Sequence, residues 1–207
     1  MPRLTTALFA LMICAGTGAS GAASPRGKTV DPLNRVRTLV AAVIVGDEVR
    51  VQHIAAELRE QPRPPRGDRR VARDLNERGL ALWQRQRFDE AAVLFRQAHA
   101  ADASDAEIAE NLGYSLLKSG QVASAETALL AALALAPERA SAWGSLGLVY
   151  AKQDKHREGV AAVLTAYRYT RDPKRTLDVY SRLATTDDDP KVRAVLADVV
   201  SRLSKPS

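Results

Sequence analysis

Cysteine, histidine and aromatic residues are scarce in this 207-residue chain. The single cysteine, Cys14, excludes an intramolecular disulfide framework. The three histidines, His53, His99 and His156, lack the spacing of metal ligands, so we interpret each as a surface or helix-packing side chain. The chain also has no glycine-rich phosphate loop, nucleophile elbow or zinc motif. The sequence therefore indicates a protein without catalysis, cofactor or metal.

Alanine and arginine are abundant, with 36 Ala and 23 Arg against only 7 Lys. Alanine is the residue that costs least in a helix, so this composition favours an all-helical protein. The net charge is +6, and the segment Arg59–Arg87 carries nine Arg against four acidic residues. Such a cluster could attract anionic partners, although a solvated charged face is the simpler interpretation. No interleaving of aromatic and basic residues points to nucleic acid.

The first 23 residues have the layout of a secretory signal peptide. Arg3 gives the positive start, residues 7–15 form an apolar run, and small residues lead to a cleavage end at Gly21-Ala22-Ala23. The nine-residue run is short for a membrane span, which needs about 20 apolar residues, although an uncleaved anchor stays the alternative. Together with the Arg and Ala bias, this segment predicts a bacterial protein that is periplasmic or secreted.

Residues 24–60 are predicted to form a short arm followed by a helical hairpin. Asp31-Pro32 is a typical helix start, and apolar residues follow at helical spacing up to Gly46-Asp47 and again up to Leu58. The alternation around Gly46-Asp47 would also suit a β-hairpin. Residues 61–70 hold three Pro and one Gly and are predicted to be a linker. The tripeptide Arg66-Gly67-Asp68 within it matches a cell-adhesion motif by chance and is not interpreted as a binding site.

An internal repeat dominates the rest of the chain. Gly79, Gly113 and Gly147 are spaced by 34 residues, and small and large apolar residues recur in the same register around each of them. This pattern resembles the tetratricopeptide repeat (TPR) family, whose unit is a helix–turn–helix. The resemblance covers residues 72–173, as units 72–105, 106–139 and 140–173. Arg78 at an apolar position and Gly159 at a position for Ala are departures from the family pattern.

The resemblance implies an all-α, TPR-type solenoid of stacked helical hairpins over residues 71–173. Small residues let the two helices of a unit approach each other, and larger ones fill the space that is left. Residues 174–207 are predicted to form a degenerate fourth unit, a pair of capping helices. The run Asp187-Asp188-Asp189-Pro190 is a helix start rather than a calcium loop.

The resemblance also implies a concave groove lined by the first helix of each unit. Carried onto this sequence, the groove residues are Arg73, Asn76, Leu80, Trp83, Glu107, Glu110, Asn111, Tyr114, Leu117, Lys118 and Leu148. Trp83 and Tyr114 are expected to anchor a partner, and the two asparagines could bond to a peptide backbone. Alternatively, Trp83 packs under the linker or under residues 32–60, which would then occupy the groove.

These observations predict an exported scaffold or adaptor that binds a protein or peptide during assembly of an envelope complex or appendage. The alternative is an accessory subunit or regulator of a membrane-bound or peptidoglycan-acting enzyme, with residues 32–60 engaging that enzyme. Membrane association is expected only through a partner or an uncleaved signal.

Processing of the signal segment is directly testable. We expect N-terminal sequencing of the protein from a bacterial envelope fraction to begin at or near Ser24, because the small residues before it suit signal peptidase. A protein recovered from the cytosol with Met1 or Pro2 at its start would contradict export.

Overall fold

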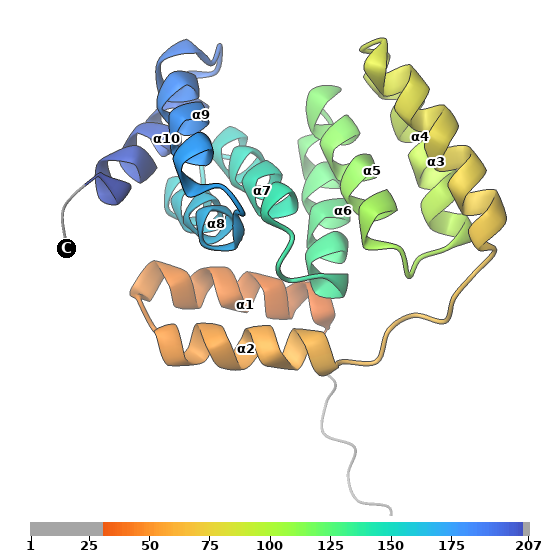
Figure 1. The fold of residues 1–207 in the computed structure, drawn as a ribbon, viewed down its shortest axis with the longest axis horizontal. Coiled ribbons are helices and arrows are strands. Elements are labelled where there is room, and N and C mark those ends of the chain that lie inside the picture. The colour runs from red at the N-terminus through yellow and green to blue at the C-terminus, as the bar shows by residue number, and fades with distance from the viewer. Residues whose placement is uncertain (1–30, 205–207) are drawn as a thin grey trace, which may run out of the picture.

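The computed structural model describes residues 31–204, and the predicted signal and arm at residues 1–30 lie outside this range. Within it the chain forms ten α-helices and no strand (Figure 1). Their bounds are α1 Pro32–Val45, α2 Glu48–Glu60, α3 Arg69–Gln84, α4 Phe88–Ala101, α5 Ala106–Lys118, α6 Val122–Leu135, α7 Ala140–Lys152, α8 His156–Tyr169, α9 Pro173–Thr186 and α10 Pro190–Leu203. None of these helices has both the length and the apolar content of a membrane span.

Aspartate caps set several of the helix starts. Asp31 accepts a hydrogen bond from the Leu33 amide at 3.2 Å, and Asp189 accepts one from the Lys191 amide at 2.9 Å. Proline follows each of them as the first helical residue, so both predicted starts are confirmed. Asp68 caps α3 in the same way, so the linker ends at this residue and not at Arg70 as predicted.

The repeat glycines make the closest contacts between the two helices of each unit. A Cβ atom added at any of them would lie far inside van der Waals distance of a large side chain on the second helix. The pairs are Gly79 with Phe95 at 2.6 Å, Gly113 with Leu129 at 2.6 Å and Gly147 with Val163 at 2.4 Å. All three large side chains are fully buried. The predicted 34-residue register of small and large residues is thereby confirmed.

The turn inside each unit repeats as well. Gln86, Gly120 and Asp154 adopt the left-handed backbone conformation with φ of 59°, 78° and 63°. These positions are again 34 residues apart. Glutamine at such a position is unusual, because residues other than Gly, Asn and Asp rarely adopt the left-handed backbone conformation.

Arg78, the departure from the family pattern, lies at the open end of the solenoid. Leu112 and Leu146, its counterparts in the next two units, are buried between hairpins. No hairpin precedes α3 on that side, so Arg78 is exposed and pairs with Asp74 on the same helix at 3.3 Å. A polar outer face is what a terminal repeat needs.

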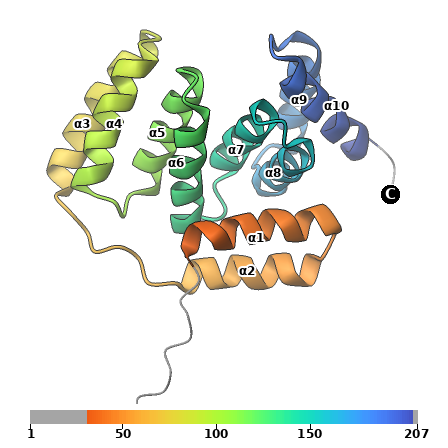
Figure 2. The same ribbon diagram turned by 180° about the vertical axis from the view of Figure 1, so that it is seen from behind.

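The N-terminal hairpin of α1 and α2 packs on the second helices of the units. Residues 32–60 are helical, as in the first of the two alternatives above, and α1 lies across both α6 and α8 (Figures 1 and 2). The first helices α5 and α7 contact each other directly, whereas α6 and α8 leave a gap that α1 fills. Val36, Leu39 and Val40 of α1 are buried there in the main hydrophobic core.

Glu126 of α6 is the polar centre of this packing. Its carboxylate accepts hydrogen bonds from the Arg37 guanidinium at 3.1 Å and the Gln153 amide at 2.9 Å, and the Lys155 ammonium lies 3.6 Å away. Burial alone would raise the pKa of Glu126, but these donors and cations outweigh it and the pKa is lowered. The carboxylate thus joins α1, α6 and the turn between α7 and α8 as an ionised group.

The C-terminal pair closes the solenoid through α10 instead of α9. The first helix of a unit packs on the unit before it at the α4–α5 and α6–α7 junctions, but α9 scarcely touches α8 and has no buried residue. α10 covers α8 and reaches α7. Gly159, the second departure, permits this, because a Cβ there would lie 3.1 Å from Val195 of α10. The pair is a cap that does not stack as a fourth unit.

Truncation of the core between units is expected to destabilise the whole solenoid. Leu146→Ala should lower the free energy of unfolding by about 2–5 kcal/mol, since Leu146 is fully buried and leaves a cavity. Urea denaturation followed by circular dichroism measures this, with Val93→Ala, a half-exposed position on α4, as the matched control. A loss below about 0.5 kcal/mol, the scale of surface substitutions, would contradict the core assignment.

The Glu126 network predicts a pH-dependent contribution to stability. Glu126→Gln should cost about 1–3 kcal/mol near neutral pH, because it removes the negative charge that accepts hydrogen bonds from Arg37 and Gln153 and pairs with Lys155. The folded-state pKa lies below the ordinary value of 4.5, so this contribution is present above 4.5 and is lost as the pH falls through the folded-state pKa. Denaturation curves of both proteins should therefore converge in acid, and a gap that stays constant with pH would contradict this origin.

Candidate peptide-binding groove

The exposed side of α3, α5 and α7, here called the groove face, is opposite the side on which α1 packs. These helices are the first of each unit, and α5 and α7 touch while α6 and α8 diverge. The surface therefore curves toward the groove face. Within residues 31–204 the N-terminal hairpin does not cover it, so the alternative in which residues 32–60 occupy the groove is not seen.

Two asparagines join α3 to α5 near the middle of the groove face. Asn111 donates a side-chain hydrogen bond to the Asn76 side-chain oxygen at 3.0 Å. This contact leaves the side-chain oxygen of Asn111 free to accept, and the side-chain amide NH2 of Asn76 free to donate, further hydrogen bonds. The pair can therefore still bond to a peptide backbone, as the sequence suggested, from a position that each side chain fixes for the other.

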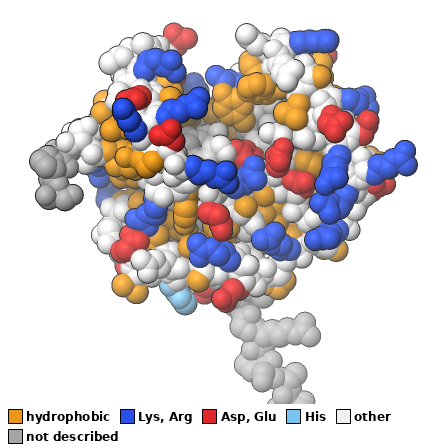
Figure 3. Space-filling view, in the orientation of Figure 1, with side chains coloured by type: hydrophobic (Ala, Val, Ile, Leu, Met, Phe, Trp, Pro, Cys, Tyr) orange, Lys and Arg blue, Asp and Glu red, His pale blue; other side chains and the backbone are white. Residues whose placement is uncertain are grey.

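An aromatic cluster lies at the C-terminal ends of α3 and α5. The Trp83 ring centroid is 5.8 Å from that of Tyr114 and 6.2 Å from that of Phe88, and the Lys118 ammonium lies 5.6 Å from the Tyr114 centroid. Trp83 and Tyr114 are both half-buried, so one face of the cluster stays accessible. Trp83 packs against these rings and not under the linker. Figure 3 shows hydrophobic side chains gathered at the upper end of α5.

The other predicted groove residues differ in how far they are accessible. Arg73 and Glu107 are exposed, whereas Leu80 is half-buried and packs against the main core. Glu110 is largely covered and pairs with Arg139 at 2.6 Å, so its charge is already neutralised. Leu117 is a correction: its side chain is only 5% exposed and belongs to the main core, because the next hairpin covers this side of α5.

Leu148 leads into a hollow between α7 and α9 that sequence reasoning missed. The hollow has a volume of about 330 Å³ and is lined by Gly144 and Leu148 of α7 and by Tyr180 and Leu183 of α9, among others. It exists because α9 stands away from α8, which the linear sequence does not reveal. Burial raises the pKa of Tyr180 to about 12, so its phenol is neutral at ordinary pH.

Residues suited to catalysis are not brought together in the part of the chain that the structure describes. Within it no group of three His, Cys, Asp or Glu side chains could hold a metal. His53 lies 3.5 Å from Glu57 and His156 lies 3.3 Å from Asp198, both on the surface. His99 is half-buried on α4, and burial lowers its pKa.

Comparison with known proteins agrees with the repeat. The family model described as tetratricopeptide repeat matches residues 82–154. The chain carries tetratricopeptide repeats within this segment. No curated protein sequence matches it.

Solved structures share the fold of this repeat protein at low sequence identity. The type III secretion chaperone SycD of Yersinia enterocolitica, solved in complex with a peptide of the translocator YopD, aligns with a TM-score of 0.51 and 12% identity over 64% of this chain and 94% of SycD. An alternative dimer of SycD aligns at 0.52 and 12% identity over 65% and 96% of the two chains.

Proposed function

We propose that this repeat protein is an exported, non-enzymatic scaffold that binds a protein or peptide segment on its groove face. The observation that carries the proposal is the opposite placement of two surfaces. The N-terminal hairpin covers the diverging side of the solenoid at α6 and α8, while the curved side keeps accessible aromatic, amide and apolar groups.

The groove face offers three kinds of contact along one path. The half-buried Trp83–Tyr114 pair can anchor an apolar or aromatic side chain, because such rings supply large contact area at low entropic cost. The Asn76–Asn111 pair offers hydrogen bonds to an extended backbone. The hollow beside Leu148 and Tyr180 is wide enough for a second apolar side chain. This sequence of contacts suits an extended segment with two apolar anchors.

A relative of the same fold supports a peptide as the ligand. SycD was solved with a peptide of the translocator YopD. The proposal does not include recognition of a C-terminal carboxylate by groove lysines, because Lys152 pairs with Asp189 at 2.8 Å and Lys118 lies over Tyr114. The signal-like residues 1–23 support the part of the proposal that locates the protein in the bacterial envelope, where it would act in assembly of a complex or appendage.

The alternative proposal is an accessory subunit that engages an enzyme through the N-terminal hairpin. Val45 and Val49 favour it, because they are 72% and 81% exposed at the tip of this hairpin. Exposed valines on both sides of one turn could serve as a small apolar contact.

Site-directed cross-linking can distinguish these surfaces. Cys14 lies in the predicted signal, so the mature chain carries no other cysteine and a single one can be introduced anywhere. Lys118→Cys places a thiol beside Tyr114, Val49→Cys places one at the hairpin tip, and Val93→Cys on α4 is the control. All three are exposed positions, so the fold is not expected to change.

We expect an envelope partner to cross-link at position 118 and not at position 93. The same partner should be lost from an affinity pull-down when the bait, residues 24–207, carries Trp83→Ala and Tyr114→Ala with unchanged helicity. Cross-linking at position 49 alone would favour the accessory-subunit role. Equal capture by the double variant would place recognition outside the groove face.

A further inference from the structure

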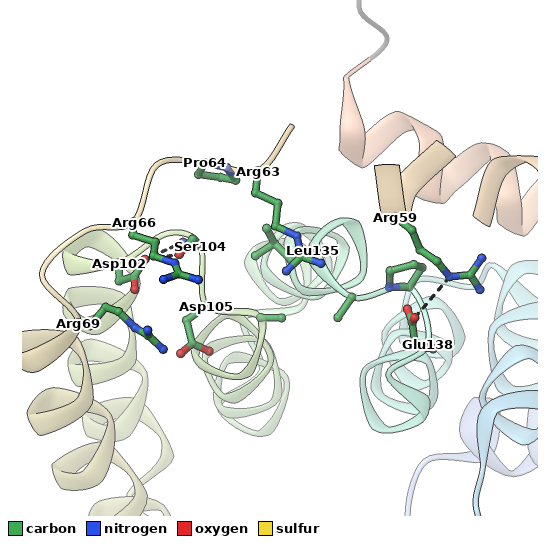
Figure 4. A pocket seen from close by; sticks show the side chains of 13 residues that line it. Arg59, Arg63, Pro64, Arg66, Arg69, Asp102, Ser104, Asp105, Leu135 and Glu138 are labelled. Carbon is green, nitrogen blue, oxygen red and sulfur yellow. Dashed lines mark hydrogen bonds and ion pairs between the residues drawn. The ribbon is translucent and has the colours of Figure 1, made fainter. Parts of the chain in front are cut away.

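A second pocket, the linker pocket, lies where the linker crosses the loops between repeat units (Figure 4). It has a volume of about 370 Å³ and lies between the linker and the loops that join α4 to α5 and α6 to α7. Arg59, Arg63, Arg66 and Arg69 contribute to its lining. The groove face does not share these residues.

The linker is held in place at both of its ends. Gly67 donates its amide to Asp102 at 3.3 Å, and Asp68 donates its amide to the Ala101 carbonyl at 2.9 Å. A Cβ at Gly67 would lie 1.9 Å from that carbonyl oxygen, so only glycine allows the contact. At the other end Gln61 donates its side-chain amide to the Ala134 carbonyl at 2.6 Å.

The arginines recur every three residues along this fixed segment. Arg63 and Arg66 flank Pro64-Pro65, and Arg69 is the first residue of α3. A proline-rich segment favours the polyproline conformation with three residues per turn, in which residues i and i+3 lie on the same side. Figure 4 shows Arg63, Arg66 and Arg69 on the side of the linker that faces the inter-repeat loops. All three arginines therefore contribute to the lining of the same pocket.

The carboxylates of the linker pocket are already committed to other partners. Asp102 is only 2% exposed and accepts hydrogen bonds from the Ser104 hydroxyl at 2.6 Å and from Gly67. Asp105 caps α5 through the Glu107 amide at 2.9 Å, and Glu138 lies 3.4 Å from Arg59. Among residues 31–204 no carboxylate lies within 4.0 Å of the other three guanidinium groups.

We propose that the linker pocket binds a small polyanion that carries phosphate or carboxylate groups. Three planar guanidinium forks match such groups, because each can donate two parallel hydrogen bonds to one of them. The volume is that of a small-molecule site and not of a folded partner. An anionic group would give Arg63, Arg66 and Arg69 the partners that no carboxylate among residues 31–204 provides within 4.0 Å.

Calorimetric titration of the mature chain with pyrophosphate, and separately with citrate, tests the proposal. Arg63→Gln combined with Arg66→Gln should weaken binding at least about tenfold, because it removes two charge-assisted forks. Arg70→Gln combined with Arg96→Gln is the matched control, since both residues are exposed and outside the pocket. This control should change the dissociation constant by less than about twofold, as expected for exposed charges.

Binding of either anion that depends on Arg63 and Arg66 supports the proposal. Preference for pyrophosphate would identify phosphate as the natural group, and preference for citrate would identify carboxylate. The proposal is overturned if neither anion binds saturably, or if the control variant weakens binding as much as the pocket variant. Circular dichroism of both variants keeps a loss of fold distinguishable from a loss of binding.

Discussion

The contact between a glycine on the first helix of each unit and a large side chain on the second is the constraint on which the structure depends. Gly147 and Val163 approach so closely that even a methyl group would not fit between them, and the same holds 34 and 68 residues earlier. This contact fixes the geometry of a single hairpin. Because three hairpins share it, they stack in one register and bury a continuous core.

The curvature of this stack gives its two sides different roles. Where the first helices α5 and α7 touch, the second helices α6 and α8 diverge and expose apolar surface. Helix α1 covers that surface and Glu126 joins it to the stack. The hairpin thus contributes to stability on one side and leaves the curved side accessible for a partner. At the C-terminal end α10 packs on α8, where Gly159 lies close to Val195, and α9 lines the hollow beside Leu148.

The fold was predictable from the sequence because periodic contacts leave a periodic trace. The glycine register, the aspartate–proline helix starts and the aromatic pair were all visible in it. Features that depend on how the hairpins are placed relative to one another could not be predicted from the sequence. Leu117 was assigned to the groove although the next hairpin buries it, and Tyr180 was not recognised because the hollow that it lines depends on how α9 is placed beside α7. Likewise, Asp102 gave no sign that it holds the linker, since its partner Gly67 lies 35 residues away.

Paramagnetic relaxation on the mature chain tests most directly whether the hairpin covers the diverging side and leaves the groove face open. A nitroxide attached through Ala41→Cys would stand on α1, next to Glu126 and Glu158. We predict that the amide signals of Glu126 and Glu158 are broadened, while those of Asn76 and Trp83 keep their intensity. Broadening at Asn76 and Trp83 would show that the hairpin lies over the groove face and would contradict the account.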